Sequence, residues 1–157
     1  MRSFKKEVLE FLERNDFEKN LREIHKFEAK KLVNALFPFL YNTDKRIKDR
    51  TIMAMGEVVS KIAKDDLDFA RTIMRRLMLS LTEESGGIGW GAPEAMGEIM
   101  ARSEKLAEEY HKILISYTLG GGNELDFEDL QKDVTAGLKR LSQVHPNLVE
   151  EVKHLLK

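Results

Sequence analysis

The sequence predicts an all-α protein, an α-α superhelix built from a short array of helical hairpins. Three observations predict this fold. Apolar residues recur every three or four positions along nearly the whole chain, which is the spacing of one helix face. No segment shows the alternation of apolar and polar residues that is typical of a strand. The string Ala-Met-Gly-Glu followed by an aliphatic residue occurs twice, at Ala54 and at Ala95, 41 residues apart.

The first predicted helices form an N-terminal cap over residues 1–27. Ser3 can cap the first helix, because its hydroxyl can accept a bond from a free backbone N–H. Asn15 and Asp16 interrupt this helix before a second, short one. The apolar faces of the two helices consist of Phe4, Val8, Leu9 and Leu12, and of Phe17, Leu21 and Ile24.

The repeats are expected over residues 28–145. The first begins with a helix from Glu28, which Pro38 should kink because proline removes a backbone donor. Asp44, at the end of a polar turn, precedes a longer second helix that reaches Lys64. The apolar face of that helix consists of Ile47, Ile52, Met55, Val58, Val59 and Ile62.

Two further hairpins follow. The first starts at Asp65 and is interrupted by a glycine-rich segment. Its second helix begins at Pro93, where the missing donor costs nothing. Ser103 can cap the next helix, which stops at the string GGGN over residues 120–123. Asp126 is expected to cap the last long helix. His145 then ends it, and residues 146–157 form a C-terminal capping helix.

Small residues recur in register in the second helix of each hairpin. A glycine inside a helix costs about 1 kcal/mol relative to alanine, so its repeated use suggests a packing reason. We expect neighbouring hairpins to approach closely at these sites. A period of about 40 residues is typical of stacked helical hairpins. The residues concerned are Ala54 and Gly56, Ala95 and Gly97, and Ala136 and Gly137.

The first unit resembles the HEAT-repeat consensus. The string LFPFL at 36–40, followed by Asp44, Arg50 and AMG at 54–56, carries the resemblance. It implies a HEAT-like solenoid of about three hairpins, in which Asp44 and Arg50 form a structural ladder between turns and neighbouring repeats. The later units depart from the consensus. Trp90 and Gly91 stand where Arg50 would align in the second unit, and Asp133 stands there in the third.

A second resemblance concerns the string GIGWGAPEAMGE at 87–98. It is similar to a string found in a small group of uncharacterised bacterial HEAT-like proteins. The likeness implies the fold and assigns no activity.

Composition limits the possible functions. The 157 residues fit one domain, 1–157, that is long enough to bury a core. The chain has no cysteine, which excludes disulfides and fits the cytoplasm, where we expect the protein. No run approaches the roughly 18 apolar residues of a membrane span. A net charge of −1 argues against a dedicated nucleic-acid binder. The four histidines lack metal-site spacing, so we expect neither a metal nor a cofactor.

The glycine-rich stretch 83–98 is the candidate binding site, and it contains the only tryptophan of the chain. In a structural interpretation its glycines take left-handed dihedrals and Trp90 fills a gap between repeats. In a functional interpretation, a rigid aromatic side chain amid accessible backbone is a binding hot spot. The residues expected to bind are Trp90, Gly86, Gly87, Gly89, Gly91, Glu84, Glu94 and Glu98.

These features predict a non-catalytic interaction or scaffold module that binds another protein or a peptide. Glutamates surround Trp90, and Glu94 would repel an outside anion from the helix start, so a basic segment is favoured over a nucleotide. Two alternatives remain. One is a HEAT-like enzyme or accessory protein resembling bilin lyases or DNA glycosylases. The other is a structural subunit that associates with itself through methionine-rich faces, which would make a homo-oligomer.

Overall fold

The computed structural model describes residues 3–82 and 89–157. These residues form helices and connecting turns, and no strand occurs in either range. The prediction of an all-α protein is therefore confirmed for this part of the chain.

The N-terminal elements are short. Ser3 caps α1, as predicted, by accepting a hydrogen bond from the backbone N–H of Lys6. The helix ends before the predicted interruption at Asn15 and Asp16. At Phe37, just before Pro38, the chain changes from an α-helix to a 3-10 helix, where the sequence predicts a kink. The elements are α1 (Phe4–Glu13), η1 (Leu21–Lys26), α2 (Ala29–Leu36) and η2 (Phe37–Tyr41).

The remaining helices are longer. Pro93 lies in the first turn of its helix, as predicted. Ser103 caps the following helix, also as predicted, by accepting a hydrogen bond from the backbone N–H of Leu106. The predicted cap at Asp126 is wrong: Phe127 occupies the N-cap position, without a side-chain hydrogen bond. The elements are α3 (Lys45–Asp65), α4 (Leu67–Leu79), α5 (Ala92–Arg102), α6 (Glu104–Ser116), α7 (Glu128–Val144) and the 3-10 helix η4 (Pro146–Leu155).

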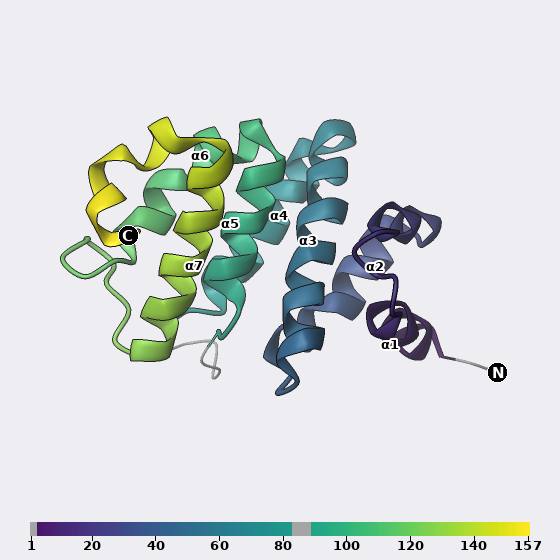
Figure 1. Cartoon of the computed structure of the whole chain (residues 1–157). Helices are drawn as coiled ribbons and strands as arrows, with labels where there is room; N and C mark the ends of the chain where they lie inside the picture. The colour runs from purple at the N-terminus through teal and green to yellow at the C-terminus, as the bar shows by residue number, and fades with distance from the viewer. Residues whose placement is uncertain (1–2, 83–88) are drawn as a thin grey trace.

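Figure 1 shows α3, α5 and α7 side by side in one row, with α4 and α6 behind them. The helix α5 packs against α3 on one side and α7 on the other, and each helix of the back row contacts its neighbours in sequence. The two ends of the chain lie at opposite ends of the row (Figure 1). One continuous apolar core extends from Val8 in α1 to Val152 in η4.

Glycines bring the helices of the front row close together. A Cβ atom added to Gly97 of α5 would clash with the backbone of Gly137 in α7. A Cβ atom on Gly137 would lie 2.5 Å from the carbonyl oxygen of Pro93, and one on Gly56 would lie 2.6 Å from Cγ of Glu98. Gly97 and Gly137, which the sequence places 40 positions apart, therefore meet across α5 and α7, whereas Gly56 faces the side chains of Glu98 and Arg102.

Within residues 3–82 and 89–157, Asp44 and Arg50 do not form the expected ladder. Asp44 instead caps α3, where its carboxylate accepts the N–H of Arg46 at 2.9 Å. The guanidinium of Arg50 donates to the carbonyl oxygens of Leu12 and Arg14, each at 2.7 Å. The reason is that carbonyls at the end of α1 lack helical partners and attract a cationic donor. Both residues still stabilise the fold, by separate contacts.

We predict that Gly97→Ala destabilises the protein by about 1–3 kcal/mol, because the added methyl group has no room against Gly137. Gly122→Ala is the matched control, since nothing lies within 4 Å of its added Cβ, and its effect should stay within about 0.5 kcal/mol. Urea unfolding followed by circular dichroism measures both changes. Equal stability of the two variants would contradict the prediction.

Candidate functional site

Two glycines adopt the left-handed backbone of the turn around Trp90, which we call the Trp90 turn (residues 89–91). Gly89 has φ of +75° and Gly91 has φ of +85°, values that only glycine adopts readily. The turn is also held close to its surroundings. A Cβ atom on Gly89 would lie 2.5 Å from the carbonyl oxygen of Ser80, and one on Gly91 would lie 2.9 Å from that of Leu40. The left-handed backbone that the structural interpretation expects is present at both positions.

Trp90 is not the fully buried residue that the structural interpretation expects. It is 43% exposed, one of the few large apolar side chains that remain accessible to solvent. A tight turn with a partly exposed indole matches the functional interpretation of this stretch better than the structural one. Of the other expected binding residues, Glu84, Gly86 and Gly87 lie outside the described residues.

Asp133 in α7 holds the Trp90 turn in place. Its Oδ2 accepts the backbone N–H of Gly91 at 2.7 Å, and its Oδ1 lies 3.6 Å from Nζ of Lys48 in α3. One carboxylate thus connects the turn to both neighbouring helices of the front row. Sequence reasoning noted Asp133 only as a departure from the repeat pattern. Asp133 follows Gly91 by 42 positions, which is about one repeat, and this spacing was the only sign in the sequence that the two residues could meet.

Glu94 lies half-buried in the first turn of α5, four residues after Trp90. Within the described residues, no hydrogen bond or salt bridge holds its carboxylate. Burial raises its pKa, and the negative charges of Asp133 and Asp49 raise the pKa further, against the opposing effect of Lys48 and Lys45. Those two lysines are already close to other carboxylates, Asp49 for Lys45 and Asp133 for Lys48. Within the described residues, the charge of Glu94 is therefore only partly compensated, by the more distant Lys48 and Lys45.

Glu98 occupies a different environment from the one expected. Its exposure is 7%, and both of its carboxylate oxygens accept bonds from arginines: Arg102 at 2.6 Å and Arg140 at 2.9 Å. Glu57 of α3 extends this group, at 3.9 Å from Arg102. The close contact between α5 and α7 brings Arg140 within reach. Glu98 thus links α5 and α7, and its charge is compensated within the chain.

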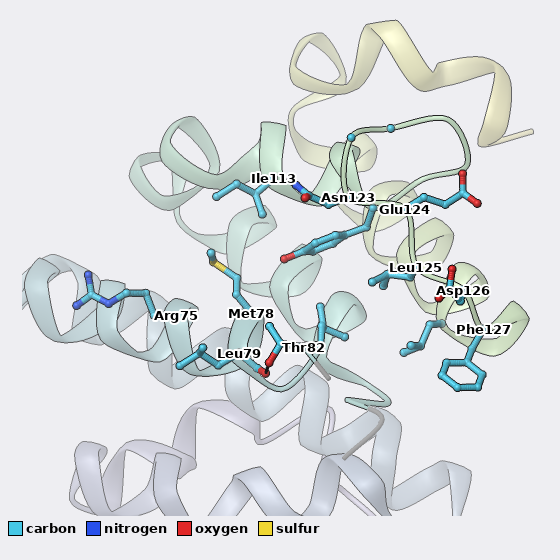
Figure 2. Close-up of a pocket in the computed structure, with 15 residues that line it drawn as sticks. Arg75, Met78, Leu79, Thr82, Ile113, Asn123, Glu124, Leu125, Asp126 and Phe127 are labelled. Carbon is cyan, nitrogen blue, oxygen red and sulfur yellow. Dashed lines mark hydrogen bonds between the residues drawn. The ribbon is translucent and has the colours of Figure 1, made fainter. Parts of the chain in front are cut away.

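A pocket of about 980 Å³ opens near the Trp90 turn, between the ends of α4 and α6 and the segment that leads into α7 (Figure 2). It is connected to the turn through Leu81, which lines the pocket and lies close to Gly89. The lining is mainly apolar, with Met78, Leu79, Leu81, Ile113, Tyr117, Leu125, Phe127 and Leu130 as its apolar and aromatic members.

Sequence reasoning missed this pocket. The apolar residues Leu125 and Phe127 follow a glycine-rich stop and do not belong to a helix face, so helical spacing assigned them no role. Their occurrence in a short loop was the only signal. Leu79 and Phe127 remain 59% and 57% exposed.

The described residues contain no group of three or more metal-ligating side chains close enough to hold an ion. Within the same residues, no helix combines the length and the apolar character that crossing a bilayer requires.

Compared with family models, with curated proteins and with solved structures, the chain has no match. A functional assignment therefore depends on the geometry of the site.

We predict that Glu94→Gln stabilises the protein at neutral pH. Because the pKa of Glu94 is raised in the folded state, folding favours its protonated form. The wild type therefore loses stability as the pH rises from the ordinary pKa of glutamate through the raised one, and the Gln variant does not. The difference in melting temperature between the two proteins should reach its full size above the raised pKa of Glu94. It should be absent below the ordinary pKa of a glutamate. A variant less stable than wild type at pH 7 would contradict this assignment.

Proposed function

We propose that the chain is a short HEAT-like solenoid that acts as a non-catalytic protein-interaction module. The front row of α3, α5 and α7, joined by contacts one repeat apart, supports the solenoid. Such arrays commonly present extended surfaces for binding. The partner would be a peptide or a basic segment of another protein, bound at the Trp90 turn.

The exposure of Trp90 is the observation that carries this proposal. Leaving 43% of a tryptophan in water forgoes hydrophobic stabilisation, which amounts to about 25 cal/mol per Å² of apolar surface. The turn that holds it is also restrained, by the hydrogen bond from the Gly91 N–H to Asp133 and by the close packing of both glycines against neighbouring backbone. A preorganised aromatic side chain loses little entropy on binding, and tryptophan is enriched among the residues that dominate interface energies.

Glu94 supports a basic rather than an acidic partner. Its carboxylate is partly desolvated and lacks a cation of its own within the described residues. A lysine or arginine from a partner, placed beside it, would supply the missing charge, and such charge-assisted contacts are stronger than neutral ones. An anionic partner would meet repulsion from the same group. Glu98 takes no part, because Arg102 and Arg140 already bind it.

We predict that Trp90→Ala folds normally and loses at least about 30-fold in affinity for its partner, as expected for a hot spot worth about 2 kcal/mol. Proteins captured by the immobilised chain from an extract of the source cells would be purified, and their dissociation constants measured. Leu155→Ala, which truncates another exposed apolar side chain at the far end of the chain, is the control. A folded Trp90→Ala variant with undiminished affinity for every captured protein would remove the assignment.

A further inference from the structure

The pocket next to the Trp90 turn is lined by a tyrosine whose hydroxyl has no hydrogen-bond partner among the described residues. Tyr117, at the end of α6, lines the pocket and is only 7% exposed. Within the described residues its hydroxyl makes no hydrogen bond. Every completely buried side-chain oxygen or nitrogen among these residues has a hydrogen-bond partner. The Tyr117 hydroxyl has none, so it must keep some surface accessible to solvent. A buried phenol that opens into a pocket can donate a hydrogen bond to whatever occupies it.

The walls of the pocket expose apolar surface on two sides. Leu79 comes from the end of α4 and Phe127 from the start of α7, and both are more than half exposed. Figure 2 shows these two side chains on opposite sides of the opening. Exposed apolar patches that line a groove are typical of sites for protein partners or ligands. A volume of about 980 Å³ is at the upper end of the ~300–1,000 Å³ range of ligand clefts, so the pocket has room for more than one side chain.

The charges at the rim indicate what kind of occupant fits. Glu124 and Asp126 lie on the side of the pocket that leads into α7, and Arg75 lies on the α4 side (Figure 2). None of the three makes a salt bridge with another described residue. Glu128 and Asp129 follow directly in the first turn of α7, and Lys132 lies 3.9 Å from Asp129. Negative charge thus predominates on the α7 side, where a basic segment would find complementary charge.

We propose that this pocket receives the apolar side chains of a basic segment of the partner protein. Tyr117 donates a hydrogen bond to a carbonyl oxygen of that segment, and lysine or arginine residues beside the apolar ones pair with Glu124 and Asp126. This inference rests on the proposed function, since the pocket would hold a part of the same partner that Trp90 anchors. Leu81, which lines the pocket and lies close to Gly89, places the pocket next to the Trp90 turn.

The test uses the full chain and a phage-displayed library of random peptides about 12 residues long. Enriched peptides would be synthesised with a fluorescent label, and their dissociation constants measured by anisotropy. We expect large apolar residues with lysine or arginine nearby in the enriched sequences. Tyr117→Phe removes one hydroxyl and should weaken binding about two- to tenfold, the value of one hydrogen bond. The double variant Glu124→Gln with Asp126→Asn should weaken binding and reduce its dependence on salt.

Glu150→Gln, an exposed carboxylate outside the pocket, is the control and should leave binding unchanged. Circular dichroism would verify that each variant is folded. No enrichment, enrichment of acidic peptides, or binding that the pocket variants do not alter would overturn the inference. Trp90→Ala separates the two proposals. If it weakens peptide binding while the pocket variants do not, the pocket assignment fails and the proposed function stands. If neither changes binding, both fail.

Discussion

The close approach of α5 and α7 is the contact on which the rest of the structure depends. It requires Gly97 and Gly137, because a methyl group on either would meet the backbone of the facing helix. At this short separation, Arg140 reaches the buried carboxylate of Glu98, and Asp133 reaches the N–H of Gly91. The close packing of Gly97 against Gly137 thus makes both polar contacts possible. The second of them positions the Trp90 turn, so the packing of small residues and the presentation of the candidate site are physically connected.

Periodicity in the sequence predicts the helices and the register of the glycines, because both are local or repeat with a constant interval. It predicts less of the site. Spacing of four residues places Glu94 and Glu98 on one helix face, yet their surroundings differ completely. Glu98 pairs with Arg102 of its own helix and with Arg140 of α7. Around Glu94, burial and the carboxylates of Asp133 and Asp49 raise the pKa instead. Such differences arise from side chains one repeat away, which local patterns do not reveal.

The pocket illustrates a second limit of sequence patterns. Its wall combines the end of α4 with the end of α6 and the irregular segment that leads into α7, so residues more than 30 positions apart in sequence line one pocket. From the sequence alone, an apolar residue in a loop, such as Phe127, is interpreted as an isolated exposed side chain. Only the structure shows that it lines a pocket. The pocket lies next to the Trp90 turn, because Leu81 lines the pocket and also lies close to Gly89.

The central claim is that contact between α5 and α7 holds the Trp90 turn in a fixed conformation. Time-resolved anisotropy of the tryptophan emission tests it most directly, because Trp90 is the only indole in the chain. In Asp133→Ala, which removes the acceptor of the Gly91 N–H, we expect a faster local anisotropy decay than in wild type, while the helical content stays unchanged. An identical decay in the two proteins would show that the turn is ordered by other contacts, and would contradict this account.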